Sequence, residues 1–375
     1  MKKFVLIPDS FKGTLSSTEI CKITEQTLRR FEPDADILSI PVADGGEGSV
    51  DCFLTALGGE RIFVDCQGPY MENIRAFYGL LKGGETAVVE MAAAAGLPMV
   101  EARKDPLHTT TYGVGQLILS AAQRGAKRII VGLGGSCTND FGCGAAYACG
   151  VRFYDEQGNS FMPVGGTLER VARIDLSQRS PLLDGVEIVT MCDIDNPPYG
   201  PHGAAYVFAP QKGADEVAVK LLDNGVKHLC EVVAETLGTD ISALSGGGAA
   251  GAMGAGMVVF FGSVLKMGID VVLETVRFSE KIENADMIFT GEGKIDSQSL
   301  RGKVVIGVAR AAKRSGVPVV AVVGGADGDL SAAYAEGVTA VFSINRLPQD
   351  LSISRHHSAE NLAFAVENIA RLLTV

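Results

Sequence analysis

The sequence predicts an α/β protein built from two α/β domains with parallel sheets. Its 375 residues suggest two domains more than one, and 47% of them are hydrophobic, enough for large buried cores. Short β-branched runs recur along the chain. Each is followed by a loop rich in Gly, Asp and Ser and then by a stretch of helical character. The runs are apolar throughout, as expected of strands that are covered on both faces.

The strand–loop–helix unit lies near both ends of the chain and once in between. Its copies cover residues 4–31, 37–59, 128–150, 287–316 and 318–337. In the first copy, Ser16 and Glu19 have the spacing of a capping box, which predicts the start of a helix. A last strand at 338–344 precedes a C-terminal helix that begins near Ser358. Alternation of this kind predicts a sheet whose ligands bind at the carboxyl ends of its strands.

The middle of the chain departs from this strand–loop–helix pattern. Residues 68–96 indicate strand, turn and strand before an Ala-rich helix start, and residues 151–175 indicate a hairpin and a loop. We therefore predict a discontinuous α/β domain from 1–70 plus 280–375. A second α/β domain, 71–279, is inserted into it. The apolar segment 241–265 has the length of a membrane span, but its seven glycines favour a buried turn that enters a helix.

Charge and cysteine usage restrict the class of partner. The formal net charge is −11, so an extended nucleic acid is not expected as a partner, whereas a small anionic substrate is compatible with a few local cations. The eight cysteines are scattered and form no CxxC pair, and the N-terminal apolar run is too short for a signal peptide. We expect reduced thiols, a cytoplasmic location, no membrane partner and a monomer or homodimer.

Five loops that follow predicted strands carry most of the candidate chemistry. They are PDSFKG at 8–13, ADGGEGS at 43–49, GLGGSCTND at 132–140, CDIDNPPYG at 192–200 and GEGKIDSQSLRGK at 291–303. Gly, Asp and Ser are ordinary turn and cap residues, so each loop alone also has a purely structural interpretation. Together, their exposed backbone N–H groups suit a phosphate, and their carboxylates would repel it unless a divalent cation lay between. This composition favours Mg-nucleotide chemistry.

Familiar nucleotide-binding fingerprints are missing. The sequence has no G-x-x-x-x-G-K-[ST] loop, no complete dinucleotide-binding loop and no H-R-D or D-F-G of a protein kinase. The five loops, in this order and over nearly the whole chain, nevertheless resemble the bacterial glycerate kinase family. DSFKG together with GEGKIDSQS is the most diagnostic pair. Small departures, among them Cys137 for an expected alanine and Phe141 for an expected glycine, remove no charged residue.

The resemblance implies transfer of the γ-phosphoryl group of ATP to D-glycerate, with 2-phosphoglycerate as the expected product. It also implies two α/β domains, one of them Rossmann-like or flavodoxin-like, with the active site in the cleft between them. ATP and Mg²⁺ are the expected cofactors. Phosphoryl transfer depends mainly on positioning and on neutralisation of charge, which suits loops that combine acids, hydroxyls and cations.

Candidate site residues follow from these loops. We predict Asp193 as the general base, since it ends a strand and begins a Pro-stiffened loop, and Lys12 as a catalytic cation that binds phosphate or carboxylate. The best metal ligands are Glu292 and Asp296, with Asp44 and Glu47 as the other pair. The predicted substrate- and phosphate-binding residues are Asp9, Ser10, Ser136, Thr138, Asn139, Asn196, Lys294, Gln298, Arg301 and Lys303.

Other functions remain open at this point. Lys12 could be a solvated surface lysine and Asp193 part of an Asx turn. The D-x-D at the end of VTMCDID resembles the nucleophile motif of haloacid-dehalogenase-type phosphatases, although Asn-Pro follows it here. A kinase for another small hydroxy acid, or a non-catalytic metabolite-binding protein on the same scaffold, would carry similar loops.

Overall fold

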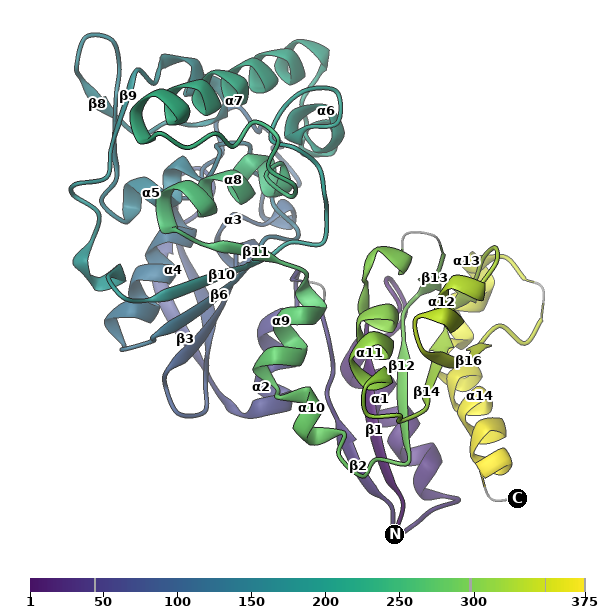
Figure 1. Cartoon of the computed structure of the whole chain (residues 1–375). Coiled ribbons are helices and arrows are strands. Elements are labelled where there is room, and N and C mark those ends of the chain that lie inside the picture. Colours follow the sequence, from purple (N-terminus) through teal and green to yellow (C-terminus); the bar gives the residue numbers. More distant parts are fainter. Residues whose placement is uncertain (44, 297–298, 348, 374–375) are drawn as a thin grey trace. The chain divides into compact units, whose positions relative to one another are not determined.

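A computed structural model describes residues 1–43, 45–296, 299–347 and 349–373 of the chain. It confirms the predicted α/β class with parallel sheets (Figure 1). The chain forms two compact units. The first comprises Met1–Asp44, Asp51–Leu57 and Met267–Val375, and the second Gly45–Val50 and Gly58–Lys266. The boundaries thus lie near 58 and 267, where the sequence analysis places them near 70 and 280.

The first unit contains a five-stranded parallel sheet of order β16-β14-β12-β1-β2. Its strands are β1 (Lys3–Pro8), β2 (Asp36–Ser39), β12 (Met287–Gly291), β14 (Val319–Val323) and β16 (Val338–Ser343), with a small accessory pair β13 (Lys294–Ile295) and β15 (Gly325–Ala326). Counted along this unit alone, the order is 2-1-3-4-5, which is the flavodoxin-like arrangement. Its direction of winding reverses between β1 and β12.

Helices cover both faces of this sheet. They are α1 (Ser17–Arg29), α2 (Ser49–Leu57, whose first two residues belong to the second unit), α9 (Gly268–Thr275), α10 (Phe278–Lys281), α11 (Val304–Lys313), α12 (Ser331–Ala335), α13 (Leu351–Ser354) and α14 (Ser358–Leu373). On one face, Phe4 and Phe289 share a core with α1 and α14. The alternate strand residues are also buried, and α11 contacts β1, β12 and β14.

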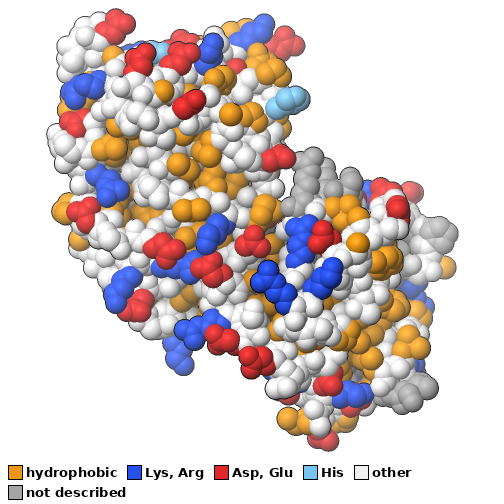
Figure 2. Space-filling model, in the orientation of Figure 1, with side chains coloured by type: hydrophobic (Ala, Val, Ile, Leu, Met, Phe, Trp, Pro, Cys, Tyr) orange, Lys and Arg blue, Asp and Glu red, His pale blue; other side chains and the backbone are white. Residues whose placement is uncertain are grey.

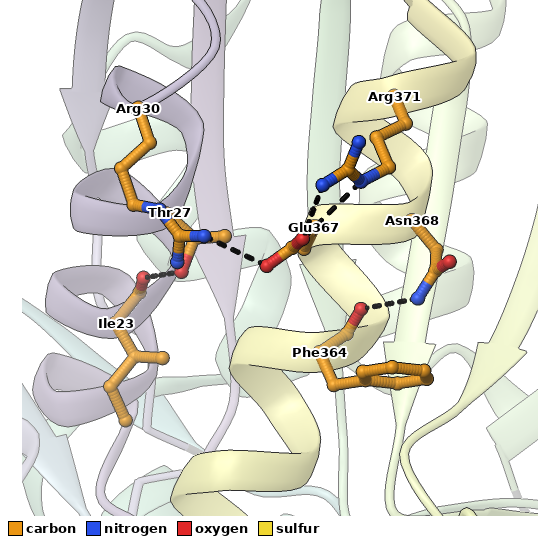
Figure 3. Close-up of polar contacts among 7 residues, drawn as sticks. All are labelled: Ile23, Thr27, Arg30, Phe364, Glu367, Asn368 and Arg371. Carbon is orange, nitrogen blue, oxygen red and sulfur yellow. Dashed lines mark hydrogen bonds and ion pairs between the residues drawn. The ribbon is translucent and has the colours of Figure 1, made fainter.

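Local signals in the sequence account for the ends of these helices. The predicted capping box is present at the start of α1, where Ser16 accepts from the backbone N–H of Glu19 and the Glu19 side chain accepts from that of Ser16. Figure 3 shows how α1 and α14 are joined at their exposed edges: Glu367 accepts hydrogen bonds from Arg30 and Arg371, each at 2.9 Å. Exposed ion pairs of this kind add little stability each, so burial of the apolar helix faces holds the two helices in place.

The second unit contains a six-stranded mixed sheet of order β11-β10-β6-β5-β4-β3. β11 (Val264–Lys266), β10 (Glu187–Met191), β6 (Arg128–Gly132) and β5 (Thr86–Glu90) are parallel, whereas β4 (Asn73–Leu81) and β3 (Gly59–Gln67) form an antiparallel extension. The predicted hairpin is present as β7 (Arg152–Tyr154) and β8 (Ser160–Phe161), joined by β9 (Arg173–Asp175). The helices are α3 (Ala92–Ala95), α4 (Tyr112–Gln123), α5 (Cys143–Ala148), α6 (Ala204–Phe208), α7 (Glu216–Leu237) and α8 (Ala249–Phe261).

The apolar, Gly-rich segment forms a buried turn and then α8, as predicted. Its glycines permit close packing: a Cβ on Gly251 would lie 2.1 Å from the carbonyl oxygen of Thr138, and one on Gly256 would lie 2.0 Å from that of Phe141. At the start of α8, Ala250, Gly251 and Ala252 have left-handed backbone angles. In the described part of the chain, no helix combines the length and the hydropathy needed to cross a membrane.

The structure shows the state of the thiols and the distribution of charged side chains on one face. All eight cysteines are free and buried. On the face shown in Figure 2, basic side chains lie interspersed with acidic ones.

The left-handed alanines at the start of α8 provide a test of backbone strain. Replacing Ala250, which has φ 54°, with Gly is expected to stabilise the protein by about 0.5–1 kcal/mol. Glycine removes the free-energy penalty that a left-handed backbone imposes on alanine, about 1–2 kcal/mol. This gain exceeds the entropic cost of ordering the more flexible glycine on folding, about 0.5–1 kcal/mol. The matched variant Ala249→Gly changes the preceding residue, which has no positive φ, and should destabilise by about 0.5–1 kcal/mol. Urea unfolding of both variants measures the contrast, and equal midpoints would contradict it.

Candidate active site

The reversal point of the first sheet brings two of the predicted loops together. Because β1 and β12 are neighbours, the loop after β1 and the loop after β12 leave the same edge side by side, where open α/β sheets bind ligands. The backbone N–H of Asp9 donates to the carbonyl of Gly291 at 2.8 Å. Gly293 lies close to the first loop, since a Cβ on it would be 3.6 Å from the backbone nitrogen of Lys12. The second loop is further held by the N–H of Gly324, which donates to the Glu292 carbonyl at 3.2 Å.

Glu292 is the most unusual group of this edge. It is only 6% exposed, and its Oε1 has no hydrogen-bond partner among the described residues. Burial raises the pKa of the Glu292 carboxyl to about 7; the Ser299 hydroxyl and the Lys303 ammonium oppose this rise, and the carboxylates of Asp9 and Asp296 add to it. Glu292 therefore interacts with two further predicted acids, Asp9 and Asp296, and with the predicted cation Lys303. The sequence analysis expects such a combination for a site that binds a cation and an anion.

The remaining predicted residues of the first unit are less enclosed. Lys12 is exposed and Ser10 is half-buried. Lys294 is exposed and pairs with Asp327 at 2.7 Å, and this partner raises the pKa of the lysine. Lys303 is the N-cap residue of α11. Asp44 and Gln298 lie outside the described residues, and so does the side chain of Arg301.

In the second unit, the glycines of two predicted loops pack against each other. A Cβ on Gly132 would lie 2.4 Å from the carbonyl oxygen of Gly45, and one on Gly134 would lie 2.4 Å from the Cα of Gly46. The Gly134 N–H also donates to the Gly45 carbonyl at 3.0 Å. The sequence analysis expects these glycines to admit a ligand. In the structure their small size permits contact between the two loops. Glu47, one of the predicted metal ligands, is exposed here.

Glu90, at the end of β5, is a residue that the sequence analysis overlooks. It is 4% exposed, and its Oε1 accepts a hydrogen bond from the backbone N–H of Val50 at 2.6 Å. A buried carboxylate thereby holds the end of the 43–49 loop. Its position at the end of a predicted strand is a signal that could have identified it. However, the residues directly after it, Met91 and the alanines of α3, are apolar and contain none of the Gly, Asp and Ser that characterise the five predicted loops.

The loop after β6 contains three predicted phosphate-binding residues at different depths. Ser136 is 7% exposed and follows the exposed Gly135. Thr138 and Asn139 are fully buried, and no described residue forms a hydrogen bond with Thr138 Oγ1 or with either polar side-chain atom of Asn139. The structure therefore brings all three together, but only the serine end of the loop borders solvent.

The buried carboxylate of Asp140 connects this loop to neighbouring backbone N–H groups. Its carboxylate accepts from the N–H and hydroxyl of Thr111, at 2.7 and 2.8 Å, and from the N–H groups of Gly142 and Gly144, at 3.1 and 3.2 Å. Burial raises the pKa of Asp140, and these hydrogen bonds oppose the rise. The acid thus satisfies N–H groups at the starts of both α4 and α5, which need a partner because the preceding turn supplies none.

Lys212 is a second functional candidate that the sequence analysis misses. It is 2% exposed, and its ammonium donates to Ser136 Oγ and to the Thr138 carbonyl, each at 2.7 Å. Burial lowers the pKa of Lys212 to about 8, while Cys137 and Asp140 act in the opposite direction. Its segment, APQKGA, follows a helix and no strand, so a search of post-strand loops does not reach it.

The loop after β10 contains the predicted base. Asp193 is half-buried directly beyond the strand end, and Asp195 is exposed. Asn196, a predicted substrate ligand, donates from Nδ2 to the carbonyl of His202 at 2.8 Å, which gives it a role in shaping the loop. The half-buried carboxylate at the carboxyl end of a parallel strand remains suitably placed for a general base.

Comparisons with known proteins agree over the whole chain. A family model described as the glycerate kinase family matches residues 4–374. A glycerate kinase of Bacillus cereus is 44% identical over 98% of this chain and 97% of its own. A glycerate 2-kinase of Escherichia coli is 41% identical over 100% and 98%. A crystal structure from Salmonella typhimurium LT2, provisionally described as a glycerate kinase 2, superposes with a TM-score of 0.88 at 41% identity, covering 99% of this chain and 98% of that one.

Proposed function

Because this chain belongs to the glycerate kinase family, we propose that it transfers the γ-phosphoryl group of ATP to D-glycerate and forms 2-phosphoglycerate. The family predicted from the five loops is confirmed. The observation that carries the proposal is Glu292, beside Lys303 at the reversal point of a flavodoxin-like sheet. It is a buried carboxylate, and one of its oxygens has no partner in the part of the chain that the structure describes. The name of the Escherichia coli relative, glycerate 2-kinase, supports the choice of product.

The residues around Glu292 fit a divalent cation. The carboxylate is buried, one of its oxygens lacks a partner within residues 1–43, 45–296, 299–347 and 349–373, and Asp9 and Asp296 disfavour its ionisation. Among the described residues no cluster of three or more His, Cys, Asp or Glu could hold a metal, but Mg²⁺ commonly takes only one or two carboxylates and completes its shell with substrate phosphates and water. We propose Glu292 and Asp296 as its ligands. When bound, Mg²⁺ would offset the negative charge of the transferred group.

The chain's own residues supply the remaining functions. Lys303 at the start of α11, and Lys12 on the neighbouring loop, are proposed to bind phosphate oxygens, which the N-terminal end of a helix also favours. Asp193 is proposed to accept the proton of the attacking hydroxyl. Ser136 is proposed to donate to an anionic oxygen of the reactants. Membership of the family disfavours the phosphatase alternative for the D-x-D of β10, whereas a different small hydroxy acid as acceptor is the competing proposal.

We also propose that the protein acts in the cytoplasm as a monomer or homodimer. The eight buried, unpaired thiols support a reducing compartment.

A turnover assay tests the function directly. Purified protein with ATP and Mg²⁺ should convert D-glycerate to a product whose ³¹P spectrum matches 2-phosphoglycerate and not 3-phosphoglycerate. Omission of Mg²⁺ with excess chelator should stop the reaction. Formation of ADP with another hydroxy acid but not with D-glycerate would overturn the choice of substrate. No ADP with any acceptor would overturn the kinase proposal.

A further inference from the structure

We propose that Lys212 is a positioning residue of this enzyme: its ammonium orients Ser136 so that the serine hydroxyl donates to an anionic oxygen of the bound reactants. That oxygen belongs either to the carboxylate of the acceptor or to a phosphate of the nucleotide. The inference rests on the proposed function, and it adds to the site a residue that lies outside the five loops.

The direction of the hydrogen bonds carries the argument. An ammonium group can only donate, so Ser136 Oγ must accept from Lys212 at 2.7 Å. The hydroxyl hydrogen of the serine must then point to another acceptor. A hydroxyl that accepts a charge-assisted bond is polarised and becomes a better donor. Ser136 is 7% exposed, whereas Thr138 and Asn139 are fully buried, so Ser136 has the polar side chain of this group that an incoming anion could reach.

Lys212 also fixes the backbone around Ser136. Its second bond, to the Thr138 carbonyl, holds the inner side of the turn. On the other side, the N–H of Leu97 donates to the Gly135 carbonyl at 2.8 Å and the N–H of Cys137 donates to the Ala95 carbonyl at 3.0 Å. The residues that flank Ser136 are therefore held on both sides, which limits the directions in which its hydroxyl can point.

A purely structural role would not require a charge here. Burying an ammonium is costly, and a neutral amide side chain could donate to the Thr138 carbonyl without burying a charge. Asp140, the nearby acid, is already engaged by Thr111, Gly142 and Gly144, and the thiol of Cys137 is the other titratable group that acts on the ammonium.

Unpartnered groups on the same loop provide a second, independent observation. Thr138 Oγ1 and the side-chain amide of Asn139 are fully buried, without a hydrogen-bond partner in the described part of the chain. Buried polar atoms without a hydrogen-bond partner are uncommon in native proteins, and each calls for an explanation. The packing of an apolar core does not explain why these polar side chains are present. Together with the buried ammonium, they mark this loop as a place where polar groups are kept at a cost to stability.

Calorimetric titration with D-glycerate and, separately, with ATP tests the proposal, because binding can be measured whether or not turnover occurs. The variants are Ser136→Ala, Lys212→Gln and the double variant, with Lys220→Gln on the exposed face of α7 as the matched control. Each single change should weaken one of the two ligands by about 10-fold or more, a typical loss for one charge-assisted hydrogen bond. The double variant should bind no more weakly than Ser136→Ala alone, since the lysine acts through the serine. The ligand that is weakened identifies the anion.

Several results would overturn the proposal. Equal affinities in wild type and Ser136→Ala would exclude the serine as a donor, even if Lys212→Gln failed to fold. Losses that multiply in the double variant would show that Lys212 acts independently of Ser136. Wild-type protein that bound neither ligand would overturn this inference and the proposed function together, whereas wild-type turnover with unaffected variants would overturn this inference alone.

Discussion

Replacing Asp193 with Asn is expected to lower kcat for phosphorylation of D-glycerate by about 10²–10⁴-fold, the usual contribution of a general base. Asn keeps the shape of the side chain but cannot take up the proton of the attacking hydroxyl. The KM for ATP should change little, because the proposed role concerns the acceptor. Steady-state kinetics with each substrate varied in turn would measure both effects.

Asp195→Asn is the matched control for this variant. Asp195 lies two residues further along the same loop and is exposed, so the same chemical change there should leave kcat within a few-fold of wild type. A kcat for Asp193→Asn near the wild-type value would remove Asp193 as the base. Equal losses in both variants would indicate that the loop requires negative charge and not one particular carboxylate.

Replacing Glu292 with Gln is expected to stabilise the protein at alkaline pH while it removes activity. The folded-state pKa of Glu292 is about 7 against an ordinary value of 4.5, so between these values the folded state binds a proton that the unfolded state lacks. Wild-type stability from this group therefore falls as pH rises from about 4.5 through 7. Gln imitates the neutral acid at every pH. The variant should match wild type near pH 4.5 and exceed it by about 3 kcal/mol at pH 8.

Unfolding of both proteins at pH 5 and pH 8, without nucleotide or metal, measures this difference. Glu283→Gln, an exposed site in the same unit, should show no such dependence on pH. The same Glu292→Gln protein should lose turnover by about 10²-fold or more if Glu292 takes part in binding the cation that offsets phosphoryl charge. A variant that is less stable than wild type at pH 8 would show that the carboxylate is favourably paired in the folded state.

If Glu292→Gln is more stable than wild type at pH 8 and has lost activity, Glu292 is a functional residue. Destabilising groups persist in proteins where function needs them. A buried acid that weakens the fold above neutral pH, yet is required for turnover, fits that description. Loss of activity together with loss of stability would instead fit a residue with a structural role.

The sequence alone determined the features that depend on local patterning. Apolar runs with glycine-rich loops after them predict parallel sheets because strands covered on both faces must be apolar. Ser16 and Glu19 predict the start of α1 because a capping box involves only four consecutive residues. The loops of the two most diagnostic motifs, around Lys12 and Glu292, could be placed at one edge because both follow predicted strands.

Only the tertiary structure decided which polar groups meet and how deeply they lie. The pKa of Glu292 depends on burial and on Asp9, which lies near the other end of the sequence. Lys212 reaches Ser136 across 76 positions of sequence, from a turn with no signature of its own. The glycines of 45–46 and 132–134, which resemble ligand-binding glycines in the sequence, contact one another. Burial and long-range contact arise from packing of the whole chain, and for that reason no local pattern could reveal them.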